Sequence, residues 1–174
     1  MSQATKASGE ELCKSCGLCC QGVFHSDAEL YSPSDTNIAR RIGAKILDEN
    51  SPDIKFQLPC NAFNGCCSAY PTRPSVCASH HCDLLIAHLA GQISKQTALE
   101  RSSEMQELTS AILPKLHALT GTLDLNQPEK LMAIALESFP DDASRMSFKS
   151  KNRKLLLQLG RFMILKNKHF YKNS

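Results

Sequence analysis

Residues 13–20 read Cys13-Lys14-Ser15-Cys16-Gly17-Leu18-Cys19-Cys20, which places three cysteines at intervals of three and a fourth beside the last. Gaps of two residues let successive thiolates turn towards one metal centre, and a glycine between them supplies the left-handed backbone that such a turn often needs. A second cluster follows with Cys60, Cys66, Cys67, Cys77 and Cys82. All nine cysteines lie in the first 82 residues. The spacing therefore predicts one or two metal centres held by thiolates in this half of the chain.

Disulfide bonds are the competing explanation for so many cysteines. The first ten residues contain no apolar segment of the kind that a secretion signal requires. In a reducing cytosol, dense cysteine patterns are typical of metal sites or redox catalysis, and nine is an odd number. We therefore expect a cytoplasmic protein with metal-ligating cysteines. We expect no membrane association, because no apolar run approaches the roughly 20 residues of a membrane span.

The pattern of breakers and apolar residues predicts a mainly α fold, with a loop-rich, cysteine-coordinated metal-binding half followed by an α-helical half. Residues 1–12 are polar and without periodicity, which predicts a disordered lead-in. Residues 13–91 would form the cysteine-cluster metal-binding domain, irregular over 13–33. Residues 92–174 would form an α-helical extension with a basic C-terminus.

Five helices are expected from caps and apolar spacing. In the first half, Ser32-Pro33 predicts a helix over 34–49, and a second helix should leave Cys82 and end near Gly91. In the second half, helices are expected over 108–119, with a kink or break at Pro114, from Pro128 to about 139, and over 147–166. The four prolines and glycines within 53–82 favour loops and short strands there.

Charge divides the chain unevenly. Residues 143–174 hold nine lysines and arginines and no acidic residue, whereas the preceding 142 residues hold 11 basic and 17 acidic residues. This asymmetry is typical of a solvated helix face, and it also suits an acidic protein partner for the basic C-terminal helix or docking of the tail on the acidic half of the same chain. Specific nucleic-acid binding is not expected, because nothing in the tail offers base recognition or stacking.

The cysteines also carry a family resemblance. The CxxCxxCC motif Cys13-x2-Cys16-x2-Cys19-Cys20, followed by Cys60, by Cys67-Ser68-Ala69-Tyr70-x2-Arg73-Pro74-x2-Cys77 and by Cys82, resembles the YkgJ-type cysteine-cluster family of zinc- or iron-chelating proteins. The resemblance implies eight metal ligands, namely Cys13, Cys16, Cys19, Cys20, Cys60, Cys67, Cys77 and Cys82. Flagellin lysine N-methylases contain a similar cluster, which implies that an iron–sulfur cluster is possible here.

The sequence departs from this family pattern in two places. Cys66 is an additional cysteine beside Cys67, so one thiol is expected to remain outside the ligand set. Two histidines precede Cys82, and either His80 or His81 is an alternative ligand to it. Taken singly, each of these histidines, and His25 as well, is expected to be an ordinary solvated or packed side chain.

Two metals suit the motif. A Cys-x2-Cys-x2-Cys run with a remote fourth cysteine is similar to the ferredoxin mode of holding a [4Fe–4S] cluster, and zinc accepts the same thiolates in a tetrahedral site. We favour the iron–sulfur cluster, with zinc as the alternative. We expect Cys13, Cys16 and Cys19 to share one centre with a cysteine of the second cluster. Cys20 should turn elsewhere, because adjacent residues rarely point the same way.

Arg73 and Tyr70 are candidate cofactor-binding residues. Four thiolates around Zn²⁺ or a [4Fe–4S]²⁺ core leave a net charge of −2, and a guanidinium would compensate it. The alternative is that both residues form a packed turn with Pro74.

Three classes of function fit these observations. The first is a metal-binding protein whose iron–sulfur or zinc centre is structural or redox-active. The second is a component of a protein-modifying, lysine methylase-like enzyme, although the chain has no Gly-rich nucleotide loop and no Ser/His/Asp pattern. The third is a zinc-dependent nucleic-acid-binding module, which the 6% aromatic content and the absence of tryptophan disfavour.

Overall fold

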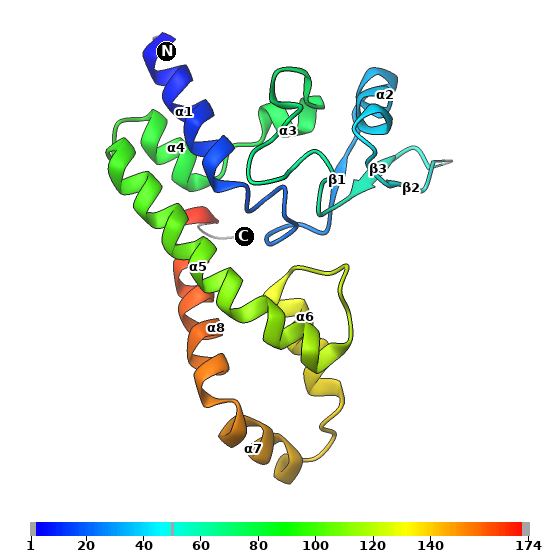
Figure 1. Cartoon of the computed structure of the whole chain (residues 1–174), viewed down its shortest axis with the longest axis vertical. Coiled ribbons are helices and arrows are strands. Elements are labelled where there is room, and N and C mark those ends of the chain that lie inside the picture. The colour runs from blue at the N-terminus through cyan, green and yellow to red at the C-terminus, as the bar shows by residue number, and fades with distance from the viewer. Residues whose placement is uncertain (1–2, 50, 172–174) are drawn as a thin grey trace.

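The computed structural model describes residues 3–49 and 51–171 and is mainly α-helical, as predicted (Figure 1). Along the chain its elements are α1 (Gln3–Cys16), β1 (Asp27–Glu29), α2 (Pro33–Arg41), β2 (Ile46–Leu47), β3 (Lys55–Gln57), η1 (Tyr70–Thr72), α3 (Ser75–Ser79), α4 (Asp83–Leu89), α5 (Lys95–Thr120), α6 (Pro128–Glu137), α7 (Asp142–Lys151), α8 (Arg153–Leu165) and η2 (Lys166–Phe170). No helix of the described residues is long and apolar enough to cross a membrane.

The long helix α5 organises the main core. It packs against α1, α4, α6 and α8, and Figure 1 shows α8 running beside it. Ile112 and Leu116 are fully buried and Leu108 is 8% exposed, as the helical spacing predicts, whereas Leu119 at the end of α5 is 38% exposed. Met105 extends the buried side one turn earlier. The expectation at Pro114 was a kink or a break, and the break is wrong because the helix runs through this residue. Pro114 lies on the exposed side, where water can bond the backbone carbonyl that the proline leaves without a partner.

A small antiparallel sheet and α2 build a second, smaller core. The strand order is β1-β3-β2, with Ala28 opposite Phe56 and Phe56 opposite Ile46. The predicted helix over 34–49 is wrong beyond Arg41, because Gly43 adopts a left-handed backbone (φ 70°) and Ile46 then enters strand β2. The buried members of this core are Leu30, Ala39, Phe56 and Leu58.

The N-terminal segment is a helix where the sequence predicted a disordered lead-in. Residues 3–12 belong to α1, while residues 1 and 2 lie outside the described residues. Tertiary packing explains the difference. Leu12 is 2% exposed in the main core, and a Cβ added at Gly9 would lie 2.9 Å from Leu89 Cδ2, so α1 fits closely against α4. Cys13 and Cys16 therefore stand on the last turn of a helix and not in an irregular segment.

The C-terminal helix is also divided. The single helix expected over 147–166 forms as α7 and α8, with a break at Asn152, whose side-chain amide donates to the Phe148 carbonyl at 3.0 Å. The chain then widens into the π-helical turn η2 and buries Phe170 in the main core at 1% exposure. This return carries the end of the chain to the first cysteine motif (Figure 1).

The main core crosses the expected domain boundary at residue 91. Leu12, Leu18, Val23 and Phe24 from the N-terminal half share it with buried side chains of α5, α6 and α8. The first cysteine motif is thus attached directly to the helical core.

Candidate metal centre

The first cysteine motif begins on α1 and turns sharply at its end. Gly17 takes a left-handed backbone (φ 60°), as the sequence suggested, and its N–H donates to the Cys13 carbonyl at 3.3 Å. A Cβ at Gly17 would lie 2.0 Å from Phe63 Cζ. The glycine therefore lets the segment with the second cysteine cluster lie directly on the first motif.

Four cysteines gather at the edge of the main core: Cys13, Cys16, Cys19 and Cys82. We call them the first quartet. Cys82 is the N-cap of α4, which packs against α1. Burial raises the pKa of Cys13 to about 11 and that of Cys16 to about 12, and the nearby Cys82 thiolate adds to both rises. The pKa of Cys19 rises well above its usual range through burial and then through Cys82 and Cys16.

The other four family-matching cysteines gather separately: Cys20, Cys60, Cys67 and Cys77. We call them the second quartet. The Cys60 N–H donates to the Cys20 carbonyl at 2.7 Å, which joins the two clusters of the sequence. Burial raises the pKa of Cys20 to about 12, and Cys67, Cys60 and Cys77 add to the rise in that order. Cys60 and Cys77 pack against the second core.

The neighbours Cys19 and Cys20 therefore face different groups of thiols. All nine cysteines are free, and Cys66 is the exposed one. The Cys66 sulfur lies 3.8 Å from the Cys67 carbonyl, outside both quartets.

Arg73 lies between the two quartets. Burial dominates the pKa of both Cys13 and Cys77, and the Arg73 guanidinium opposes the rise in each. Its Nε and Nη1 atoms are buried without a hydrogen-bond partner among the described residues. The guanidinium carbon lies 3.5 Å from the centre of the Tyr70 ring, and Lys14 Nζ lies 4.7 Å from the same centre.

Unpaired buried guanidinium nitrogens are costly, so this arrangement suits an anionic neighbour. Eight partly buried thiols in two groups, with a cation between them, fit metal–thiolate centres better than eight neutral thiols. The Tyr70 ring lies against the Arg73 guanidinium, which makes it a support for this cation.

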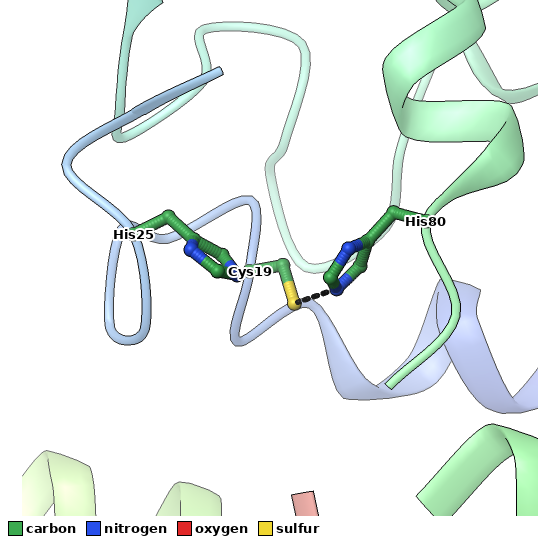
Figure 2. A group of neighbouring side chains, drawn as sticks. All are labelled: Cys19, His25 and His80. Atoms are coloured by element: carbon green, nitrogen blue, oxygen red, sulfur yellow. Dashed lines mark hydrogen bonds between the residues drawn. The ribbon is translucent and has the colours of Figure 1, made fainter. Parts of the chain in front are cut away.

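A further polar group surrounds Cys19. Figure 2 shows His25 and His80 on either side of Cys19, and the His80 Nε2 atom lies 3.7 Å from the Cys19 sulfur. The Tyr171 hydroxyl lies 2.6 Å from His25 Nε2 and 3.1 Å from His80 Nε2. Burial lowers the pKa of both histidines, with His80 adding to the effect on His25 and His81 to that on His80.

Sequence reasoning kept His80 as an alternative ligand but missed His25 and Tyr171. These two residues are 146 positions apart, and neither stands in a motif. No sequence pattern marks them; in the structure, the buried Phe170 of η2 places Tyr171 beside His25. His81 is exposed and outside this group.

The comparison with family models decides the family. The model for CxxCxxCC, described as "Putative zinc- or iron-chelating domain", matches residues 12–107, more than half of the chain. The chain belongs to the CxxCxxCC family. The match includes all nine cysteines, Tyr70 and Arg73, so the metal-chelating domain of this family extends into α5. Neither a search of curated proteins nor a search of solved structures found a match. The likeness to flagellin lysine N-methylases stays a prediction.

Proposed function

We propose that the CxxCxxCC domain of this chain holds two metal centres, one on Cys13, Cys16, Cys19 and Cys82, the other on Cys20, Cys60, Cys67 and Cys77. One observation carries the proposal: the eight thiols divide into two groups of four, with the whole first quartet against the main core and Cys60 and Cys77 of the second quartet against the second core. Arg73 between them would offset part of the charge of −2 that four thiolates leave on either a zinc ion or a [4Fe–4S]²⁺ core.

We infer that the centres are [4Fe–4S] clusters. Tetrahedral zinc with Zn–S bonds of about 2.3 Å holds its sulfurs about 3.8 Å apart. Among the described residues, the group of three ligand atoms that all lie within 4.8 Å of one another is Cys19, His25 and His80, and no three cysteines meet this condition. A cubane cluster bonds its four cysteines to four separate irons and so holds their sulfurs further apart. The Cys-x2-Cys-x2-Cys run favours the cluster, and the lack of a closer cysteine triplet among the described residues is consistent with it.

The residues of the chain would tune these centres. Burial that raises thiol pKa values to about 11 or 12 keeps the metal-free cysteines protonated at neutral pH, so loading a centre must release protons. A [4Fe–4S] cluster would supply one-electron transfer or a structural link between the two cores. The alternatives of a lysine methylase-like enzyme and a zinc-dependent nucleic-acid module gain no support from the family match.

Protein purified without oxygen tests the metal. We expect brown protein with about eight iron and eight sulfide per chain, from two cubanes of four irons each. Cys66→Ser is the matched control and should keep the full content, because Cys66 is exposed and outside both quartets. Colourless protein with two zinc ions and no sulfide would keep the quartets and reject the clusters. Protein that binds neither metal would reject the proposal.

A further inference from the structure

A mixed group of ligands lies beside the first quartet. The Cys19 sulfur and one ring nitrogen each of His25 and His80 all lie within 4.8 Å of one another. They come from three separate segments: the first cysteine motif, the loop before β1, and the end of α3. Two imidazoles and a thiolate are a donor set that suits Zn²⁺, Co²⁺ or Cu²⁺ rather than Mg²⁺ or Ca²⁺.

The Tyr171 hydroxyl lies among these three atoms. Its distances are 2.6 Å to His25 Nε2, 3.1 Å to His80 Nε2 and 3.8 Å to the Cys19 sulfur. The turn η2 and the buried Phe170 place it there, and the Tyr171 ring meets Phe24 edge-on at 5.2 Å. The Tyr171 hydroxyl thus forms hydrogen bonds with atoms that would otherwise be metal ligands.

We propose that Cys19, His25 and His80 form a third metal site, which binds a single divalent transition-metal ion, and that Tyr171 closes this site in the metal-free state. The site goes beyond the two quartets, because its histidines belong to neither. Cys19 belongs to the first quartet and also to the third site, and one thiolate sulfur can bridge two metals. The ion takes the place of the hydroxyl, so its binding competes with the Tyr171 hydrogen bonds.

Zinc binding to the protein with its two centres loaded tests the proposal. After equilibrium dialysis against Zn²⁺, we expect one more zinc ion per chain in the wild-type protein than in the His25→Gln/His80→Gln double variant. His81→Gln is the matched control, because His81 is adjacent and exposed, and it should keep the additional ion. Tyr171→Phe keeps the ring and removes the competing hydroxyl, so it should bind the ion at lower zinc concentration.

Equal zinc content in the wild-type protein, the double variant and Tyr171→Phe would overturn the third site. Iron and sulfide measured on the same samples separate this outcome from failure of the two centres. Unchanged iron and sulfide in the double variant show that the quartets are intact. Their absence from every sample rejects the two clusters, while the zinc difference between the wild-type protein and the double variant still decides the third site.

Discussion

The two cores of this protein differ in what supports them. The main core draws buried side chains from α1, α4, α5, α6, α7 and α8, whereas the second core has four buried members, Leu30, Ala39, Phe56 and Leu58. The first quartet lies at the edge of the former, and Cys60 and Cys77 of the second quartet pack against the latter. A domain with few buried apolar residues needs other support, and metal ligation is the usual source. If the two proposed centres exist, the first is added to a stable core, while the second makes its core possible.

Removal of the metal should break this comparison most clearly. Structural metal binding contributes about 10 kcal/mol or more to folding, and residues 27–79 have little else. We expect their backbone amides to lose protection from hydrogen exchange after chelation, while residues 95–165 stay protected. Unchanged protection over 27–79 in the metal-free protein would show that the second core is stable without its centre.

Two phenylalanine truncations sharpen the same contrast. Phe162 in the main core and Phe56 in the second core are 0% and 1% exposed, and Phe→Ala at a buried site costs about 3–5 kcal/mol. We expect Phe162→Ala to lower the unfolding free energy with and without metal. Phe56→Ala should have an effect only in the metal-loaded protein, because the second core is already unfolded after chelation. Denaturant unfolding of the metal-loaded and the metal-free protein measures these free energies. A lower unfolding free energy of metal-free Phe56→Ala would contradict the expectation that the second core needs its metal.

The helical half was predictable because apolar residues at helical spacing and proline or serine starts act locally. Helix α6 begins at Pro128 and α4 follows Cys82, as expected. Helix α1 was not predictable, because its polar sequence forms a helix through the contacts of Gly9 and Leu12 with α4. Strand β2 was missed because Ile46 and Leu47 continue the apolar spacing of α2, although Gly43 ends that helix.

The candidate site was predictable in its residue types and not in its full arrangement. Cysteine spacing suggested that Cys13, Cys16 and Cys19 act together and that Cys20 turns away. Which remote cysteine joins them depends on the packing of α4 against α1, and spacing carries no information about that contact. The contact between His25 and Tyr171 depends on the return of the chain after α8, which no local pattern predicts.

Gly17 connects the two cysteine clusters, and its substitution should have an intermediate effect. In Gly17→Ala the new Cβ is attached at a positive φ and clashes with the Phe63 ring. In Gly91→Ala the φ is similar, at 71°, but the new Cβ has no neighbour within 4 Å. Backbone strain of this kind costs about 1–3 kcal/mol. We expect Gly17→Ala to destabilise the protein more than Gly91→Ala and to lower its metal content. Phe63→Ala added to Gly17→Ala should restore part of the loss, and equal effects of the two glycine variants would exclude the contact with Phe63.

Asp35 should show the smallest effect, confined to the second core. Its buried carboxylate accepts hydrogen bonds from the Ser75 N–H at 2.7 Å and from the Ser75 hydroxyl, at the start of the helix that carries Cys77. Burial raises the pKa of Asp35, but the hydrogen bonds from Ser75 and Ser32 outweigh it and leave the pKa below 3.8.

A carboxyl with a lowered folded-state pKa adds stability above its unfolded pKa and loses it as the pH falls. We expect Asp35→Asn to cost about 1–3 kcal/mol at pH 7 and to remove part of the acid sensitivity below pH 4 of residues 27–79. Thermal unfolding of the wild-type protein and of Asp35→Asn between pH 3 and 7 measures both effects. An identical pH dependence in the variant would assign the acid sensitivity to other groups.

Metal analysis of single-quartet variants tests the two centres most directly. Cys82→Ser removes a ligand from the first quartet and Cys77→Ser from the second. We expect each variant to lose about half of the metal and sulfide of the wild-type protein, and the double variant to lose nearly all, because each quartet holds its own cluster. Loss of all the metal in both single variants, with the helical signal of α5 and α8 retained, would mean that the eight cysteines serve one shared centre and would contradict the proposal.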